Sequence, residues 1–319
     1  MSNRINRNTI LRIAGSLIAV ALLIYLLGEQ GWAAIVAAIR QIPLSVLLLA
    51  FGLVILSRFA VITRWYVLLR APGMDISYFQ TARITFAGLF ASNFLPTTVG
   101  GDVIRLAGAV RLHYDGALTT ASLIVDRLVG MAGMAIALPW GIPGIAQVIN
   151  QLRQPSSQSV YLLGSTSAIG GKGLVEKLWI KTMDFVHHLG LAFSIYFKKP
   201  GSLILALLYT FIHMGCVFTT IYILLKAEDQ NISWLLIAGL YSLVYFITLL
   251  PISINGYGLQ EISMTFIFSR VAGISVESSL SVALLLRTMM MLASLPGALF
   301  ISGILAGDSA VPVANLEKQ

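Results

Sequence analysis

Apolar runs of roughly membrane-spanning length recur along the sequence and restrict the chain to a small set of folds. A helix needs about 20 apolar residues to cross a bilayer, whereas a strand of a membrane barrel alternates apolar and polar residues, which the run 17–24 does not. With loops allowed for, the 319 residues hold roughly six to eight helices. We expect spans at about 13–27, 44–62, 117–138, 203–225, 232–250 and 278–305. The sequence therefore predicts an all-α polytopic integral membrane protein.

Charge and cysteine content exclude several classes of partner. Charged residues make up 11% of the chain, against about 25% in soluble domains. A net charge of +8 would suit nucleic-acid binding in a soluble protein, but here the basic residues stand mostly at span ends, as orientation signals do. The single cysteine, Cys216, lies in an apolar run and cannot form an intrachain disulfide or a thiolate metal cluster. We expect no nucleic-acid partner, no cofactor and no bound metal.

Basic residues also predict sidedness. Arg4, Arg7 and Arg12 precede the first span with no acid among them, so the positive-inside rule places the N-terminus in the cytoplasm. The apolar run that follows is long for a signal peptide and has no convincing cleavage site, so we expect an uncleaved helix in a bacterial inner (plasma) membrane. A cytoplasmic region after the second span is predicted by four further arginines, Arg58, Arg64, Arg70 and Arg83.

The segment 174–197 has the pattern of an amphipathic helix. Lys177 and Lys181 recur at helical spacing, and Leu178 lies on another face. Such a helix lies in the membrane interface with its lysines in water. Within the Ser- and Gln-rich segment 154–170, residues 159–170 either insert into the membrane or form a loop. This choice decides the sidedness of the rest of the chain and stays open.

Two similar interruptions break the apolar pattern, at 95–102 and 250–261. In each, a Leu-Pro pair is followed five residues after the proline by a glycine, and then by an acid. Proline and glycine disrupt helices, and broken backbone at membrane depth is tolerated only where it is buried in protein or lines a wet cavity. Paired breaks in two halves indicate a transport site between structural repeats, so we expect two re-entrant segments that meet. The breaking residues are Pro96, Gly100, Gly101, Pro251, Gly256 and Gly258.

Charged residues inside the expected spans predict a site. Alignment of the halves, about 44–140 and 201–305, at their breaks makes Arg127 the counterpart of Arg287. An ionisable residue at mid-span costs about 2.5–3.5 kcal/mol and by default marks a partner, a pathway or a site. Arginine can hold a phosphate through two parallel hydrogen bonds, and carboxylates balance charge or receive a cationic group. We expect one polar pocket near the membrane midplane, with the substrate-binding residues Asp102, Arg105, Asp126, Arg127, Asn255, Glu261 and Arg287.

Structural interpretations of the same residues remain open. The charged residues could form salt bridges between helices that fix the bundle, and the breaks could be short surface loops. Asp126 and Arg127 are sequence neighbours on different helical faces, so each needs a partner elsewhere. We interpret His213, in an apolar span, as a hydrogen-bonded core histidine rather than a proton relay.

Five motifs occur in order along nearly the whole chain. They are Arg64-Trp65, then Leu95-Pro96 with Gly100-Gly101-Asp102 and Arg105, then Ala121-Ser122 with Asp126-Arg127, then 250–261, and finally Arg287. Together they resemble the lysylphosphatidylglycerol synthase transmembrane-domain family, also called the flippase-like family. Its members include the flippase half of the enzyme that lysinylates phosphatidylglycerol and an archaeal dolichol-linked sugar transferase. The resemblance implies lipid or lipid-linked substrates.

The chain departs from the family pattern in two places. Gln260 stands where family members usually have arginine, and 154–170 replaces a clear hydrophobic span. No soluble aminoacyl-transfer segment is present in this sequence, so we expect a stand-alone member with a single membrane domain over 1–319.

The expected function is movement of a phospholipid or lipid-linked glycan head group between leaflets, by a transporter rather than an enzyme. One alternative is a membrane-embedded glycosyltransferase acting on a lipid-linked substrate, with Asp102, Asp126 or Glu261 as general base or metal ligand. Another is a non-catalytic membrane partner of a lipid-modifying enzyme. The sequence leaves the head group, the energy source and the oligomeric state open.

Overall fold

The structure is a computed structural model that describes residues 39–95, 99–143, 196, 198–249 and 258–306. Within these ranges the regular structure is entirely helical, which confirms the predicted all-α fold. Four described segments are long and apolar enough to cross a membrane: 44–70, 116–141, 200–227 and 276–301. The chain is therefore a multi-pass membrane protein. The expected span 13–27 and, apart from residue 196, the amphipathic segment 174–197 lie outside the described residues.

Long helices provide the spans. They are α3 (Leu44–Arg70), α6 (Gly116–Ala137), which continues into the 3-10 turn η1 (Leu138–Gly141), α9 (Pro200–Ala227) and α12 (Val276–Ser294). With a rise of 1.5 Å per residue, α3 and α9 are each about 40 Å long, more than the hydrocarbon thickness of about 30 Å. Such helices can cross the bilayer with a tilt.

Shorter helices come in two pairs, one pair next to each interruption. The first pair is α4 (Tyr78–Ser92) and α5 (Gly100–Arg111), and the second is α10 (Trp234–Thr248) and α11 (Leu259–Ala272). Each has 15 residues or fewer, below the roughly 20 that a crossing needs. The expected span at 232–250 is thus shortened to α10, because the Ser233 hydroxyl caps the helix start by accepting from the Leu236 N–H.

The second expected span proves longer than the sequence suggested. We expected it to end near residue 62, with the following arginines in the cytoplasm, but α3 continues to Arg70. Trp65, Leu68 and Leu69 are fully buried on this extension and hold it against the bundle. Arg58 and Arg64 therefore lie within one continuous apolar helix, and the side of the membrane that its end faces stays a prediction.

The last expected span, 278–305, breaks at a proline. α12 ends at Ser294, and α13 (Pro296–Ala306) begins after Leu295. Proline has no N–H to donate and so interrupts the helical hydrogen bonds at this point. Beyond the break α13 packs against α4.

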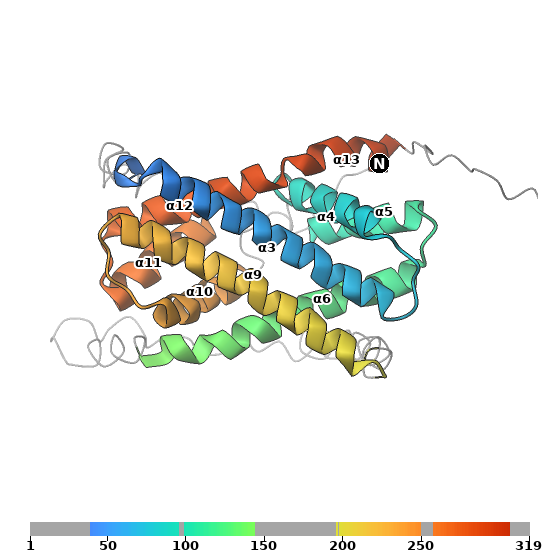
Figure 1. Ribbon diagram of the computed structural model, residues 1–319, viewed down its shortest axis with the longest axis horizontal. Coiled ribbons are helices and arrows are strands. Elements are labelled where there is room, and N and C mark those ends of the chain that lie inside the picture. Colours follow the sequence, from blue (N-terminus) through green and yellow to red (C-terminus); the bar gives the residue numbers. More distant parts are fainter. Residues whose placement is uncertain (1–38, 96–98, 144–195, 197, 250–257, 307–319) are drawn as a thin grey trace, which may run out of the picture.

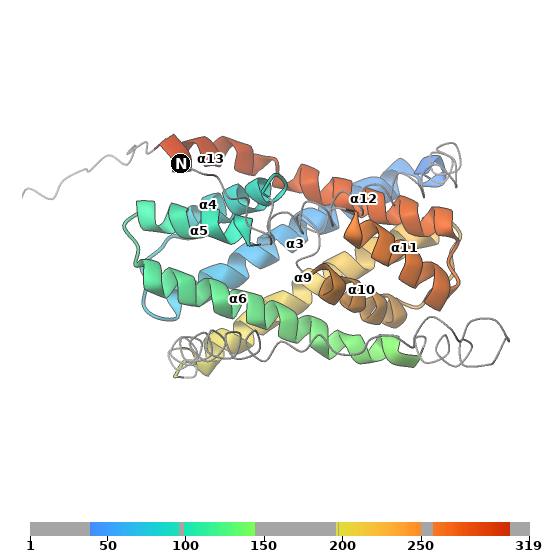
Figure 2. The same ribbon diagram turned by 180° about the vertical axis from the view of Figure 1, so that it is seen from behind.

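The helices form one bundle in which α3 and α9 lie side by side and run in opposite directions (Figures 1 and 2). Apolar side chains from α3, α9, α10, α11 and α12 make the largest buried cluster. A smaller cluster joins α3 to α4, α5 and α6 through Trp65, Ile84, Ala109 and Leu123. In Figure 2, α4 and α5 lie towards one end of the bundle and α10, α11 and α12 lie towards the other, while α6 runs along the bundle from the first group to α10.

A contact between glycines sets the position of α5 against α4. A Cβ atom on Gly88 would lie 2.7 Å from both the Gly101 carbonyl oxygen and Cγ of Arg105. A Cβ on Gly101 would in turn lie 2.7 Å from the Gly88 carbonyl oxygen. Only glycine permits backbones to approach so closely, and the contact directs the Arg105 side chain towards α6.

Candidate functional site

Five helices enclose a polar pocket of about 200 Å³. Its charged and polar lining comes from α3, α5, α6, α9 and α10, so segments far apart in the sequence meet there. The charged and polar residues of this lining are Arg64, Asp102, Arg105, Asp126, Arg127, Thr210, His213 and Tyr245. We call this group the pocket.

Asp126 on α6 lies at the bottom of the pocket, and both of its oxygens accept hydrogen bonds from arginine. Nε of Arg64 donates to Oδ1 over 2.7 Å, and Nη1 and Nη2 of Arg105 both lie 3.2 Å from Oδ2. The carboxylate is almost completely buried. A buried carboxylate needs such partners, because loss of its hydration shell would otherwise exclude the charged form.

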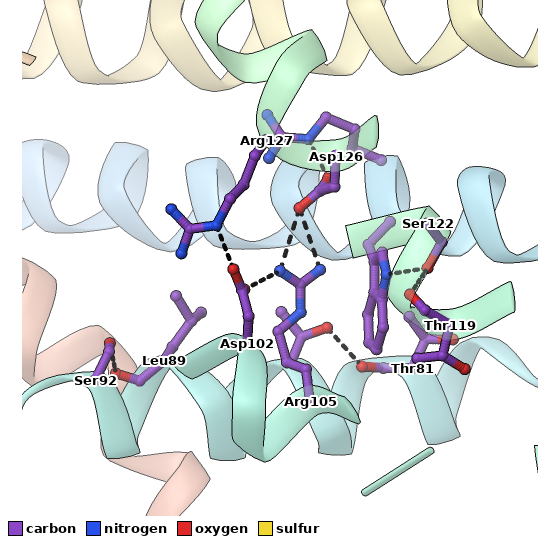
Figure 3. A network of polar contacts seen from close by, with 12 residues as sticks. Thr81, Leu89, Ser92, Asp102, Arg105, Thr119, Ser122, Asp126 and Arg127 are labelled. Carbon is purple, nitrogen blue, oxygen red and sulfur yellow. Dashed lines mark hydrogen bonds and ion pairs between the residues drawn. The ribbon is translucent and has the colours of Figure 1, made fainter. Parts of the chain in front are cut away.

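Asp102 on α5 connects two arginines. Nη1 of Arg105 donates to Oδ1 of Asp102 over 3.1 Å, and Nε of Arg127 donates to Oδ2 (Figure 3). Asp102 and Arg105 are three residues apart and so share one face of α5. Asp102 is also in the first turn of that helix, where the helix dipole favours an anion.

An indole ring supports the central arginine. The guanidinium carbon of Arg105 lies 4.0 Å from the centre of the Trp65 ring, within the range of a cation–π interaction. Nε1–H of Trp65 donates to the Ser122 hydroxyl over 3.1 Å, and that hydroxyl donates to the Thr119 carbonyl over 2.7 Å. Trp65 is fully buried, so this chain of contacts holds Arg105 in one orientation.

Exposure falls from one side of the pocket to the other. The Arg127 side chain is 36% exposed and Asp102 is 14% exposed, whereas Asp126 is only 3% exposed. The lining carries three arginines and two carboxylates, a net charge of +1 with every group in its usual ionised form. The pocket is therefore suited to a group with negative charge that approaches from the side of Arg127.

The other two predicted site charges pair with each other elsewhere. Nε of Arg287 on α12 donates to Oε1 of Glu261 on α11 over 2.7 Å, and neither residue lines the pocket. Glu261 is in the first turn of α11, which follows Gly258 at a φ of 74°, a conformation that favours glycine. Our expectation that all the predicted charges line one pocket is thus corrected, because Glu261 and Arg287 pair with each other between α11 and α12 and are absent from the pocket lining.

The breaking residues are only partly described. Gly100 and Gly101 are buried at the start of α5, and Gly258 precedes α11. The remaining predicted positions, Pro96, Pro251, Asn255 and Gly256, lie outside the described residues.

Sequence reasoning missed two arginines that α3 carries into the bundle. Arg64 binds Asp126 and also donates from Nη1 to the Thr210 hydroxyl over 3.3 Å. Arg58 lies six residues earlier and donates from Nη2 to the Met290 carbonyl over 3.4 Å. Arg58 already lay within the expected span 44–62, and continuation of the apolar pattern through Trp65, Leu68 and Leu69 was the signal that could have placed Arg64 inside the helix as well.

Other polar side chains complete the surroundings. His213, expected to be a core histidine, lines the pocket, and its Nδ1 has no hydrogen-bond partner in the described part of the chain. Among the described residues no three His, Cys, Asp or Glu side chains come close enough to hold a metal ion.

The comparisons with known proteins give a family assignment. The family described as lysylphosphatidylglycerol synthase TM region matches residues 12–297, which includes both interruptions and every charged residue of the pocket. A search of curated proteins finds no match. The order of motifs and the length of this match together show that the chain belongs to the lysylphosphatidylglycerol synthase TM region family.

Proposed function

We propose that this protein moves a phosphate-bearing lipid head group between the leaflets of the membrane, with the pocket as the head-group site. The observation that carries this proposal is the set of three arginines around two carboxylates inside an apolar bundle. Charges at this depth are costly and mark pathways by default. The family assignment agrees with a lipid-related role in the membrane.

The size of the pocket supports a head group as its ligand. Sites for whole small molecules usually have volumes of about 300–1,000 Å³, and this pocket has about 200 Å³. A phosphate with a small substituent would be held by the arginines, while the acyl chains would stay in the lipid outside the bundle.

The phosphate would bind by replacing a carboxylate as the counter-ion of an arginine. Asp102 neutralises Arg127 when no ligand is bound, and Arg127 is the most exposed arginine of the pocket. An arriving phosphate can take the place of the Asp102 oxygen on Arg127 and form two parallel hydrogen bonds with the guanidinium. Arg105, held by Asp126 and Trp65, stays in place meanwhile.

The carboxylates favour binding over proton abstraction. Both oxygens of Asp126 and both oxygens of Asp102 accept from arginine. A general base needs an oxygen that can reach the proton of its substrate. This arrangement therefore supports the transport hypothesis rather than the transferase alternative.

Liposomes test the proposal directly. The purified protein is reconstituted with lipids labelled on anionic, zwitterionic or cationic head groups, and movement between leaflets is measured per folded molecule. Arg127→Lys keeps the charge and loses the bidentate fork, so transport of the preferred lipid should fall at least about tenfold while the protein folds normally.

Arg70→Lys is the matched control, because Arg70 lies at the exposed end of α3 and pairs only with the exposed Asp75 among the described acids. That variant should transport at the rate of the unmodified protein. Full specific activity of Arg127→Lys, or no transport of any lipid by the unmodified protein, would contradict the proposal.

A further inference from the structure

We propose that Arg58 and Arg287 form a second oxyanion site, separate from the pocket, that takes a phosphate group. This inference deepens the proposed function and rests on it for the class of ligand. Its starting point is Arg58, which stands near the middle of the 27-residue helix α3. An arginine at that depth needs an anionic partner.

Arg58 has no such partner in the described part of the chain. Its only described hydrogen bond runs from Nη2 to the Met290 carbonyl, at the long distance of 3.4 Å. Its Nε is buried, and no described residue accepts from it. The arrangement is therefore incomplete, because a buried cation without a counter-ion is strongly unfavourable.

A second arginine close to Arg58 makes the deficit of negative charge larger. Arg287 lies within electrostatic range of Arg58, one helical turn before Met290 on α12. Glu261 pairs with Arg287 and is the acid of this group. Two arginines and one carboxylate leave a net charge of +1, even if Glu261 is shared between both arginines.

Unpartnered polar atoms are also found on α11, the helix that carries Glu261. Oε2 of Glu261, Nε2 of Gln260 and the hydroxyl of Thr265 are buried on α11 and have no hydrogen-bond partner among the described residues. Thr265 lies one turn after Glu261, and Tyr241 on α10 is within electrostatic range of Arg58, Arg287 and Glu261. Native proteins leave few buried polar groups unsatisfied, so a cluster of them indicates a missing ligand or water.

The donors in this group select the chemistry of the ligand. Nε of Arg58 and the Thr265 hydroxyl, which shares a helical face with Glu261, can both donate, and two guanidinium groups supply positive charge. A phosphate group meets these donors with several acceptor oxygens. It could come from a lipid head group or from free inorganic phosphate.

The second site and the pocket are connected through residues of α3 and α9. Arg58 and Arg64 lie six residues apart on α3, and His213 on α9 is within electrostatic range of both. A phosphate that moves between the two sites would therefore stay close to charged side chains along the way. The second site would then be an intermediate binding site on the path of the head group.

Thermal unfolding tests the second site in protein that has been purified in a maltoside detergent and a phosphate-free buffer. Inorganic phosphate is titrated into Arg127→Gln protein, in which the pocket is weakened, and the melting temperature is recorded. A ligand that binds the folded state raises this temperature. We expect a rise in Arg127→Gln that disappears when Arg58→Leu is added and remains when the control Arg70→Leu is added.

Stability without phosphate gives a second readout. Arg58→Leu removes an uncompensated charge, so without phosphate it should fold and melt at a higher temperature than the unmodified protein. Arg58→Lys keeps the charge but loses the planar fork, and its apparent phosphate affinity should fall about tenfold. No phosphate response in Arg127→Gln, or a response that Arg58→Leu leaves unchanged, would overturn the proposal.

Lipid nanodiscs distinguish the two sources of phosphate. If a lipid head group is the ligand, protein extracted from phosphatidylglycerol nanodiscs should retain one lipid fewer by native mass spectrometry when Arg58 is replaced by leucine. If free phosphate is the ligand, only the melting response changes. Neither readout requires transport, so failure of transport in liposomes with an intact Arg58-dependent response would refute the proposed function alone.

Discussion

Asp126 binds two arginines from different helices, and its removal affects more than one contact. Arg64 on α3 and Arg105 on α5 both depend on its oxygens. A buried pair contributes little net stability when intact, but one removed partner leaves the other as an uncompensated charge. The role of each charged residue therefore depends on what its partners would do without it.

We expect Asp126→Ala to lower the free energy of unfolding by about 3–5 kcal/mol, because the buried Arg64 loses its counter-ion and Arg105 keeps only Asp102. The measurement is denaturant unfolding in detergent, with the folded fraction checked by gel filtration. Asp75→Ala is the control, since its side chain is 98% exposed in its pair with Arg70 and its loss should leave stability unchanged. Equal stability of the two variants would show that Asp126 is not a buried counter-ion.

At the scale of secondary-structure elements, the close approach of α4 and α5 determines where Arg105 lies. The Gly88–Gly101 contact leaves no room for a side chain between these helices. Both glycines are inside or at the start of helices, where glycine is otherwise unfavourable. The packing of the elements, rather than helix propensity, explains why glycine stands there.

Gly88→Ala should force α5 away from α4 and destabilise the protein by about 1–3 kcal/mol, because the new methyl group would overlap the Gly101 carbonyl and the Arg105 stem. Transport per folded molecule should also fall, since Arg105 moves with α5. Gly52→Ala is the control, as no atom lies within 4 Å of the Cβ position in that helix interior. Thermal unfolding of both variants checks this prediction, which fails if Gly88→Ala melts at or above the temperature of Gly52→Ala.

The connection after α9 contains a buried acid that links it to α12. Glu228 accepts a hydrogen bond of 2.5 Å from the Ser281 hydroxyl, and its Oε2 has no partner among the described residues. Burial raises the pKa of Glu228 above its ordinary 4.5, more than the hydrogen bonds from Ser281 and Ser278 lower it. The folded state thus favours the protonated form of Glu228 more than the unfolded chain does.

A raised pKa in the folded state has a definite sign for stability. The contribution of Glu228 is fully present below pH 4.5 and is lost as the pH rises through the higher pKa of the folded state. Glu228→Gln should remove this part of the pH dependence and make the protein more stable at neutral pH. Melting temperatures across this pH window provide the measurement, with the exposed Asp229→Asn as control. A pH profile of Glu228→Gln that matches the unmodified protein would contradict this account.

At the scale of the whole molecule, the order of helix lengths occurs twice. A long helix, two short helices and another long helix make up α3 to α6, and the same order makes up α9 to α12. The first members of the two sets run in opposite directions (Figure 1). The division into repeat halves stays a prediction, and an inverted arrangement is the form in which it can be tested.

Inverted halves place the end of α3 and the end of α9 on opposite sides of the membrane. Single cysteines at Asp75 and Asp229, introduced separately into a Cys216→Ser background, report these two ends. A membrane-impermeant thiol reagent applied to intact cells or sealed vesicles should label one position at once and the other only after permeabilisation. Labelling of both positions from the same side would exclude the inverted arrangement.

The sequence by itself determined the class of fold. Lipid offers no hydrogen bonds to the backbone, so apolar runs of this length have to form helices, and the two interruptions had to end them. It also identified Asp102, Arg105, Asp126 and Arg127 as charges that need partners, because their cost inside a membrane follows from their position in apolar segments.

Only the tertiary structure decided which charges pair and how they divide into two groups. Arg64 and Asp126 are separated by 62 positions, and their contact depends on the packing of α3 against α6. The extent of α3 was decided in the same way, because Asp126 neutralises an arginine that would otherwise favour the end of the span. Helix periodicity is a local property, whereas the partner of a buried charge is chosen by the helices that surround it, and these come from distant parts of the chain.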